Sequence, residues 1–330
     1  MPLDEQPVNI EIRYPVSWMK PAREGLAEKL DDAALAWLDK HGLLTDPENR
    51  RNAETCDLGQ AVARSNPTAQ SDDRLTFYAR FLGLWFLYED SIEGIGTQDG
   101  YPSLISKALT TGFSSEPLSA TPTLTPWLAL GSEMAENMSP QWCRRFTARF
   151  EAWQYSVADE AILFRREGLA ADLDTYLTVR LHTLGMYVAT DMIEYTLGRE
   201  LPPEVFADPD VTEIYRLISA LCLVDNDLHC ITKDRVAGFP NLVSATARDR
   251  GLSEVQSCAR LLDWHDQLVS RFMSVERRLR SSRTDIDIAW WLDCVHFMIT
   301  GLCLWHRNAP RYQVEHRTAE GRRIRLVLGS

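Results

Sequence analysis

Several signals that would assign a chain to a common class are missing from these 330 residues. The longest apolar stretches, 81–88 and 218–224, are far shorter than the roughly 20 residues of a membrane-spanning helix. The seven cysteines include no C-x-x-C pair, which argues against a disulfide framework or a zinc site. The N-terminal segment carries early acidic residues and no apolar run, so it does not resemble a signal peptide. We therefore expect a cytoplasmic protein without a membrane partner.

Positive charge is also scarce. The chain has 35 Lys and Arg residues against 47 Asp and Glu residues, and its formal net charge is −12. Phosphate backbones are bound through many Lys and Arg side chains, so we expect no nucleic-acid partner. A phosphorylated small molecule stays open as a ligand, because a few cations and a metal ion can be focused in one cleft.

Alternating strand patterns are nearly absent, apart from a short extended segment near Val8–Tyr14. Apolar residues recur instead at helical spacing. The expected helical segments are 24–41, 74–88, 140–164, 173–197, 212–234, 253–279 and 286–305, with a break near Gly185.

The length alone leaves one or two domains open. The chain has no internal repeat and no Gly/Ser-rich linker, and its composition is even throughout. We therefore predict one all-α domain over residues 1–330, an α-helical bundle of about ten helices that encloses an apolar cavity. Residues 1–20 would form an N-terminal extended segment and 313–330 a C-terminal tail.

A first acidic cluster follows the very apolar run 81–88. Glu89, Asp90 and Glu93 are spaced so that they share one helix face. A helix C-terminus disfavours anions, and a hard divalent cation such as Mg²⁺ would offset the repulsion. Acidic helix ends are usually solvated, but the apolar run before this one favours a site at the mouth of an apolar pocket.

A second polar cluster places Asn226, Cys230 and Asp234 four residues apart, which keeps them on one face of a helix. The Asn and Asp oxygens could chelate a second metal ion. Lys233 lies beside them and could meet a phosphate.

The neighbouring Asp225 and Asp227 point elsewhere, and we expect them to be solvated or to cap a helix. Arg180 is the cation of an otherwise apolar segment, and a structural salt bridge is the commoner role of such a residue. Arg311 and Tyr312 can both donate hydrogen bonds to phosphate, although the pair is a weak signal alone.

Taken in order, these features resemble the class I terpene synthases, specifically the single-domain bacterial cyclases. That family has an aspartate-rich motif, a diphosphate-sensing arginine, an Asn/Ser/Glu metal triad and a terminal Arg-Tyr pair. The corresponding stretches here are Glu89-Asp90-x-x-Glu93, Arg180, Asn226-Asp227-x-x-Cys230-x-x-Lys233-Asp234 and Arg311-Tyr312. The resemblance runs from about Tyr14 to Tyr312.

Three positions depart from the family pattern. Glu89 stands where the family usually has Asp, Cys230 where it has Ser or Thr, and Asp234 where it has Glu. A thiol is a soft and poor ligand for Mg²⁺. The family residues Arg180, Asn226, Lys233, Arg311 and Tyr312 are all retained. We therefore interpret the three departures as compensated by an adjusted geometry of the metal site.

The resemblance implies an enzyme, a terpene cyclase that ionises a linear isoprenyl diphosphate with three Mg²⁺ ions. It would release diphosphate and close the carbocation to a cyclic terpene hydrocarbon or alcohol. Farnesyl diphosphate is the favoured substrate and geranylgeranyl diphosphate the close second; a homodimer is plausible from the family only. The implied metal ligands are Glu89, Asp90, Glu93, Asn226, Cys230 and Asp234, and the implied diphosphate-binding residues are Arg180, Lys233, Arg311 and Tyr312.

A carbocation needs a dry cavity with aromatic faces that stabilise positive charge. The expected wall residues are Phe81, Trp85, Phe86, Leu184, Trp305 and His306. For Phe81, Trp85 and Phe86, ordinary core packing is about as good an interpretation as a place in the cavity wall. We expect His182 and His229 to pack in the core or to contact the metal ligands from behind, because a hard Mg²⁺ site does not favour imidazole.

Two alternatives stay open. A chain-elongating prenyltransferase shares the metal chemistry, but it would carry a second aspartate-rich motif, and here the second cluster begins with Asn226. A catalytically impaired isoprenyl diphosphate-binding protein is supported only by the altered metal ligands. A protonation-initiated cyclase is disfavoured, since no D-x-D-D motif is present.

Overall fold

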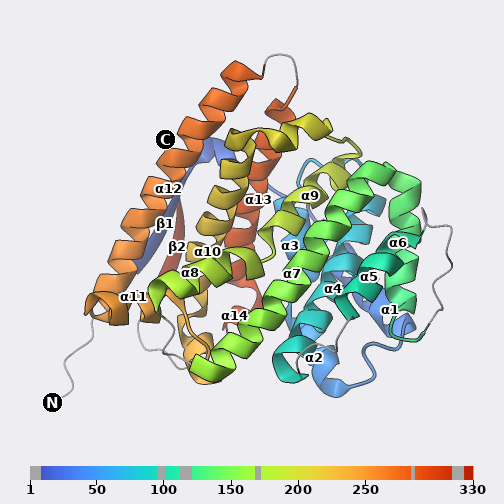
Figure 1. The fold of residues 1–330 in the computed structure, drawn as a ribbon, viewed down its shortest axis with the longest axis horizontal. Helices are drawn as coiled ribbons and strands as arrows, with labels where there is room; N and C mark the ends of the chain where they lie inside the picture. The colour runs from blue at the N-terminus through green and yellow to red at the C-terminus, as the bar shows by residue number, and fades with distance from the viewer. Residues whose placement is uncertain are drawn as a thin grey trace.

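Helices make up nearly all regular structure in the computed structural model, which describes residues 9–95, 101–111, 121–167, 172–283, 287–313 and 323–329. The predicted all-α fold is confirmed (Figure 1). The α-helices are α1 Leu26–Lys40, α2 Pro47–Thr55, α3 Leu58–Ser65, α4 Asp72–Ile95, α5 Tyr101–Leu109, α6 Thr125–Asn137, α7 Pro140–Glu167, α8 Leu173–Thr183, α9 Met186–Leu197, α10 Pro209–Ala237, α11 Leu242–Arg250, α12 Glu254–Ser282, α13 Ala289–Asn308 and α14 Pro310–Gln313. Two 3-10 helices, Val16–Trp18 and Pro203–Ala207, join them. In the described ranges, no helix combines the length and apolarity needed to cross a membrane.

The two ends of the chain meet in a short parallel strand pair. Strand β1 (Asn9–Pro15) pairs with β2 (Arg323–Gly329), with Ile10 opposite Ile324. Ile10, Ile12 and Tyr14 alternate along β1 and are buried, because this face packs against α12. The sequence predicted an extended segment near Val8–Tyr14, which β1 confirms, but only a polar tail at β2, so the second strand is a correction. Residues 1–8 and 314–322 lie outside the described part.

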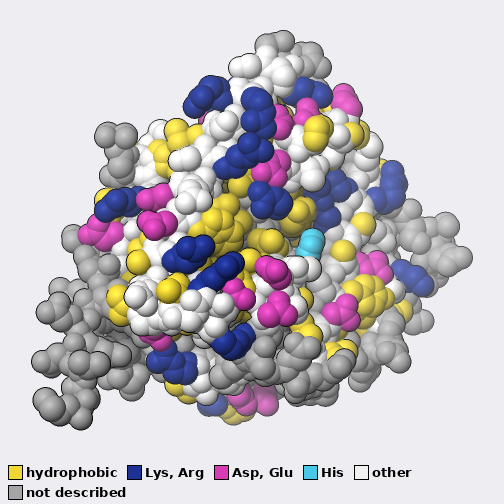
Figure 2. Space-filling view, turned by 60° about the vertical axis from the view of Figure 1, so that its left-hand side comes forward, with side chains coloured by type: hydrophobic (Ala, Val, Ile, Leu, Met, Phe, Trp, Pro, Cys, Tyr) yellow, Lys and Arg dark blue, Asp and Glu magenta, His cyan; other side chains and the backbone are white. Residues whose placement is uncertain are grey.

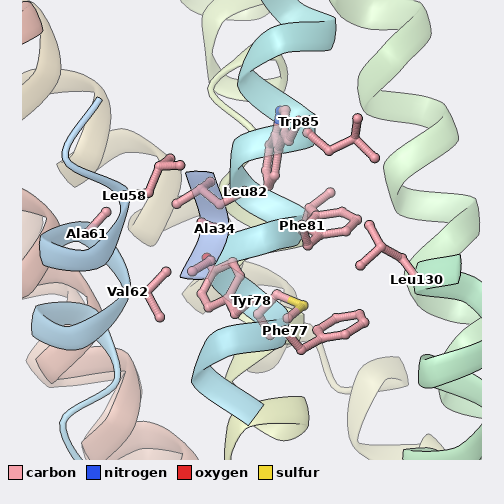
Figure 3. Packing of buried hydrophobic residues seen from close by; sticks show 14 of the residues in the cluster. Ala34, Leu58, Ala61, Val62, Phe77, Tyr78, Phe81, Leu82, Trp85 and Leu130 are labelled. Atoms are coloured by element: carbon pink, nitrogen blue, oxygen red, sulfur yellow. The ribbon is translucent and has the colours of Figure 1, made fainter. Parts of the chain in front are cut away.

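Two apolar clusters form the core, one on either side of the molecule. The first is built mainly by α1, α3, α4, α6 and α7, and the second by β1, α10, α12 and α13. Figure 3 shows how α4 contributes to the first cluster: Phe77 and Phe81 point toward Leu130 of α6, whereas Tyr78 and Leu82 point toward α3. Helix α4 therefore has two different buried faces, and only one of them is turned toward α3.

Helix α10 shows why the local sequence forms a long helix. Asp208 is its N-cap, and the Asp208 carboxylate accepts a hydrogen bond of 2.9 Å from the Asp210 amide, with Pro209 in the first turn. The helix ends at Gly238, whose φ of 74° is the left-handed conformation that favours glycine. The predicted segment 212–234 lies within these bounds.

A buried charge network joins α7, α9 and α10. Asp191 and Glu194 of α9 are fully buried and form ion pairs with Arg149 and Arg145 of α7, respectively. The Tyr215 hydroxyl of α10 donates a hydrogen bond of 2.9 Å to Asp191 and accepts one of 2.8 Å from Arg149. The network fixes the three helices relative to one another, and nothing in the sequence analysis identified it.

We expect Arg149→Met to destabilise the protein by about 3 kcal/mol, because it leaves Asp191 buried without its main cation. Urea unfolding followed by circular dichroism would measure the loss. Arg144→Met, at an exposed position of the same helix, should change the free energy of unfolding by less than about 0.5 kcal/mol. Equal effects of the two substitutions would show that the network does not stabilise the fold.

Candidate active site

One large cavity lies where the two halves of the core meet. Its volume is about 760 Å³, and its lining comes from α2, α3, α4, α7, α8, α9, α10, α13 and α14. The sequence-predicted residues that line it are Trp85, Phe86, Glu89, Asp90, Arg180, Leu184, Asn226, Cys230, Lys233, Asp234, Trp305, His306, Arg311 and Tyr312. Figure 2 shows a face of the molecule on which exposed apolar side chains are ringed by groups of both charge signs. The structure thus brings residues that are more than 200 positions apart in sequence into one cavity.

One described residue among those predicted, Phe81, is not part of this lining. Phe81 is fully buried and packs against Phe146 and Phe150 of α7, with ring centroids 5.3 and 5.2 Å apart. Its assignment to the cavity wall is wrong, because the lining face of α4 passes through Tyr78, Leu82 and Trp85, and Phe81 points to the opposite side. The side chain of Glu93 lies outside the part of the chain that the structure describes.

The first acidic cluster stands at the end of α4 that meets α2 and α14. The Asn52 amide of α2 donates a hydrogen bond of 3.4 Å to Asp90 Oδ2. Arg311 Nη2 of α14 lies 3.7 Å from Asp90 Oδ1. Sequence analysis missed Asn52, since the segment that forms α2 has no apolar periodicity that would have marked it. Asp90 is therefore oriented by groups that are only half-buried, and its oxygens still face the cavity.

Asn226, Cys230 and Asp234 share the cavity face of α10, as their spacing predicted. The Asn226 amide nitrogen lies 3.3 Å from His306 Nε2. Asp234 accepts a hydrogen bond of 2.8 Å from the Asn241 amide, and burial raises the pKa of its carboxyl. Cys230 is buried, with its side chain 2% exposed.

The expectation that Asp225 and Asp227 are solvated is wrong, whereas the alternative of helix capping holds for Asp227, which accepts a hydrogen bond from the first amide of α11. Both are buried, and the Tyr14 hydroxyl of β1 donates a hydrogen bond of 2.6 Å to Asp225. Asp227 accepts hydrogen bonds from the Tyr176 hydroxyl and, at 2.7 Å, from the Leu242 amide. Burial raises the pKa of Asp225 to about 7. The prediction of solvated side chains failed because Tyr14 of β1 and Tyr176 of α8 cover the two flanks of α10, which spacing along one helix does not reveal.

Arg180 lines the cavity and also forms the salt bridge that its isolated charge suggested. Its Nη1 lies 3.0 Å from Glu160 Oε1 of α7, and the Thr183 hydroxyl donates to the same oxygen at 2.8 Å. Burial lowers the pKa of Arg180, but Glu160, Tyr176 and Asp227 together raise it by more, so the guanidinium stays charged. Sequence analysis missed Glu160, which is one of several acidic residues on α7 with nothing local to distinguish it.

The predicted break near Gly185 separates α8 from α9. Gly185 has a φ of 74°, and a Cβ atom added there would lie 2.3 Å from Cζ2 of Trp85. The Trp153 indole of α7 donates a hydrogen bond of 2.8 Å to the Thr183 carbonyl. Leu184 lines the cavity at the break itself. The break therefore lets the Trp85 ring approach the backbone more closely than any side chain at position 185 would permit.

The Arg-Tyr pair is anchored to the turn between α2 and α3. Arg311 Nη1 donates a hydrogen bond of 3.0 Å to Cys56 Sγ, and the Trp305 indole donates one of 2.8 Å to the Cys56 carbonyl. The next residue, Asp57, has a φ of 53° and is the only non-glycine in the described ranges with positive φ. Burial and the nearby Asp31 raise the pKa of Asp57 to about 6. The strained backbone at Asp57 therefore helps to position Cys56, whose thiol accepts the hydrogen bond from Arg311.

The oxygen donors of Glu89, Asp90, Asn226 and Asp234 face the cavity from two sides, a set that fits a hard divalent cation. The Cys230 thiol is the one soft donor among them.

A second cluster in the described ranges, Glu276, Asp293 and His296, also has ligand atoms close enough to hold a metal. Arg280 forms ion pairs with Glu276 at 2.8 Å and with Asp293 at 2.5 Å, so a cation already neutralises that cluster.

Known proteins resemble this chain in both sequence and fold. A family model described as "Terpene synthase family 2, C-terminal metal binding" matches residues 80–271. Spiroviolene synthase of Streptomyces violens is 25% identical over 301 residues, which cover 89% of this chain and 83% of that protein. A (−)-beta-caryophyllene synthase of Saccharothrix espanaensis, described as (2E,6E)-farnesyl diphosphate cyclizing, is 27% identical over 259 residues, covering 76% and 71%.

A solved structure supports the fold. The crystal structure of linalool/nerolidol synthase from Streptomyces clavuligerus in complex with 2-fluorogeranyl diphosphate superposes with a TM-score of 0.76 at 19% identity. The match covers 88% of this chain and 97% of that one.

Gly185→Ala should destabilise the protein by about 3 kcal/mol, since it adds steric overlap with Trp85 to the strain of positive φ. Gly42→Ala is the matched control, because Gly42 has a φ of 71° and a Cβ there would meet nothing within 4 Å. Thermal unfolding should show a loss of about 1 kcal/mol for this control. Similar losses for both variants would mean that the close approach of Trp85 carries no energetic weight.

Asp57→Asn should stabilise the protein at alkaline pH and have little effect near pH 4. The folded-state pKa of about 6 lies above the ordinary value of 3.8, so the folded protein binds the proton more tightly and ionisation of Asp57 lowers stability as pH rises between these values. Asn tolerates the positive φ and carries no charge. The melting temperature should rise by on the order of 2 °C at pH 8. Asp32→Asn, at an exposed site, is the matched control.

Proposed function

This chain belongs to terpene synthase family 2 and is a class I terpene synthase of bacterial type, and from that premise we propose that it cyclises a linear isoprenyl diphosphate. We further propose that residues 1–330 act as one terpene synthase domain. The proposal rests mainly on one observation: charged side chains line one end of a single cavity, and apolar and aromatic side chains line the rest. An elongating prenyltransferase is the weaker alternative, because the second metal-binding cluster begins with Asn226 rather than with an aspartate.

In this proposal the charged end binds the diphosphate. Arg180, Lys233 and Arg311 supply positive charge from α8, α10 and α14, and the Tyr312 hydroxyl can donate a hydrogen bond. Lys233 Nζ and the Arg311 guanidinium lie 5.8 and 5.7 Å from the Tyr312 ring, so these three groups converge on one region. Together they stabilise the negative charge that develops on the leaving diphosphate.

Three Mg²⁺ ions are proposed, held by Glu89 and Asp90, with Glu93, on one side and by Asn226, Cys230 and Asp234 on the other. When bound, Mg²⁺ neutralises the diphosphate oxygens and makes the group easier to displace. These six residues differ in quality as ligands, because the Cys230 thiol is softer than the oxygens around it. A water molecule in place of the thiol would complete the set.

The remaining cavity residues exclude water from the carbocation and determine how its carbon chain is folded. The bond from the allylic carbon to the diphosphate oxygen breaks, its electron pair leaves with diphosphate, and the carbon chain keeps the positive charge. Trp85, Phe86 and Trp305 present aromatic faces to the cavity, and the Phe86 and Trp305 rings stack with centroids 5.9 Å apart. Loss of a proton, or addition of water, then ends the reaction as a hydrocarbon or an alcohol.

Farnesyl diphosphate is the proposed substrate and geranylgeranyl diphosphate the second choice. The support is the caryophyllene synthase match, whose description specifies farnesyl diphosphate. The test is incubation of purified protein and Mg²⁺ with ten-, fifteen- and twenty-carbon diphosphates, followed by gas chromatography–mass spectrometry. A cyclic product from the fifteen-carbon substrate is expected. Linear products of greater length, formed when isopentenyl diphosphate is added, would instead indicate elongation.

Asn226→Ala should reduce diphosphate release by a factor of about 10³ or more while leaving the circular dichroism spectrum unchanged, since it removes a proposed ligand without disturbing the core. Asn137→Ala, at an exposed position of α6, is the control and should retain full activity. Unchanged turnover of the Asn226 variant would refute the metal-ligand assignment. Diphosphate binding by the parent protein without any turnover would favour a catalytically impaired binding protein.

A further inference from the structure

The contact between Asn226 and His306 joins a proposed metal ligand to a residue that sequence analysis placed in the cavity wall. The Asn226 amide nitrogen on α10 lies 3.3 Å from His306 Nε2 on α13. Both residues line the cavity, and His306 is 6% exposed. The imidazole therefore does more than present a flat face to the substrate: one of its nitrogens is occupied by the amide.

The imidazole ring is held by aromatic neighbours on several sides. The Tyr312 ring meets it edge-on, with centroids 5.2 Å apart and planes at 85°, and the Trp305 ring lies 4.9 Å away. His229 lies 6.1 Å away on the α10 side, and its Nδ1 is hydrogen-bonded to the Asp225 carbonyl at 2.6 Å. This packing restrains the ring with its Nε2 directed at the Asn226 amide.

The contact with His306 determines which end of the Asn226 amide faces the cavity. The amide NH₂ faces the ring and can only donate, so Nε2 accepts in the tautomer that carries its proton on Nδ1, and the Asn226 carbonyl oxygen Oδ1 is left on the opposite side of the group. A rotation of the amide by 180° would exchange the two and present an NH₂ group to the cavity. An NH₂ group cannot ligate a metal ion, so the orientation decides whether Asn226 is a ligand at all.

We propose that His306 is a positioning residue that fixes the amide of Asn226 with Oδ1 turned toward the metal site. The inference rests on the proposed function, in which Asn226 is a ligand. Among the proposed oxygen ligands, Asn226 alone needs such a partner, because the two oxygens of a carboxylate are equivalent donors. Asp234 is restrained separately by Asn241.

The test measures metal binding directly. Mn²⁺ binding in the presence of inorganic diphosphate, followed by electron paramagnetic resonance, gives the metal concentration at half-saturation without turnover. His306→Phe keeps an aromatic ring but removes the acceptor, and it should raise that concentration by about tenfold. His306→Gln restores an acceptor oxygen and should recover most of the loss. His296→Phe, on the same helix but outside the cavity lining, controls for a general effect of replacing a buried histidine.

A second background isolates the orientation of the amide. Asn226→Asp replaces the amide by a carboxylate, which needs no orientation. In that background His306→Phe should raise the half-saturating Mn²⁺ concentration by less than about threefold. An equal loss in both backgrounds would show that His306 acts through packing and would overturn the inference.

Asn226→Ala separates the two levels of the argument. If the number of bound Mn²⁺ ions and their affinity are unchanged by this substitution, the ligand assignment itself fails, and the inference fails with it. If Asn226→Ala removes or weakens the binding of an ion while His306→Phe leaves all binding unchanged, the ligand assignment stands and only the positioning role is overturned.

Discussion

The rotation of α10 about its own axis is the constraint on which the candidate site depends. Successive residues of a helix lie about 100° apart, so the two neighbours of Asn226 flank the cavity face. Both neighbours are aspartates, and both are buried and bonded to other elements: Asp225 to Tyr14 of β1, and Asp227 to Tyr176 of α8. Two buried acceptors on opposite flanks prevent the helix from turning, because any turn would leave one of them without its donor. Asn226 therefore faces the cavity because its neighbours face away.

This arrangement makes parts of the protein far from the cavity responsible for its geometry. Tyr14 is held by β1, and β1 is held by β2 at the other end of the chain, so the parallel strand pair contributes to the position of a proposed metal ligand. The charge network of Asp191 and Arg149 fixes α9 against α7, and α9 begins at the break that admits the Trp85 ring. Each of these groups is buried, so its displacement would leave an unpaired charge or a steric overlap.

The separation of charged and apolar surface within one cavity follows from the same packing. The acidic residues come from the last turns of α4 and α10, and the cations come from α8, α10 and α14, so opposite charges meet where helix ends converge. The middle turns of the same helices supply apolar and aromatic side chains. A diphosphate and its metal ions can be bound at one end while a reactive cation is kept from water at the other, and no side chain has to act as a nucleophile. In the proposed metal site, the oxygens near Cys230 would supply the hard ligands that its thiol does not.

The sequence by itself determined the helical class of the fold, the helix break at Gly185, and the faces of α4 and α10 that carry Asp90, Asn226 and Asp234, because all of these follow from spacing along a single helix. It did not determine the partners that orient those residues. Asn52, Glu160 and His306 meet Asp90, Arg180 and Asn226 across helix–helix contacts, and no periodicity within one segment records such a contact. Contacts between helices also decided that Asp225 and Asp227 are buried. They likewise placed Phe81 outside the cavity lining. Spacing fixes which residues share a face, whereas only the packed structure decides what that face meets.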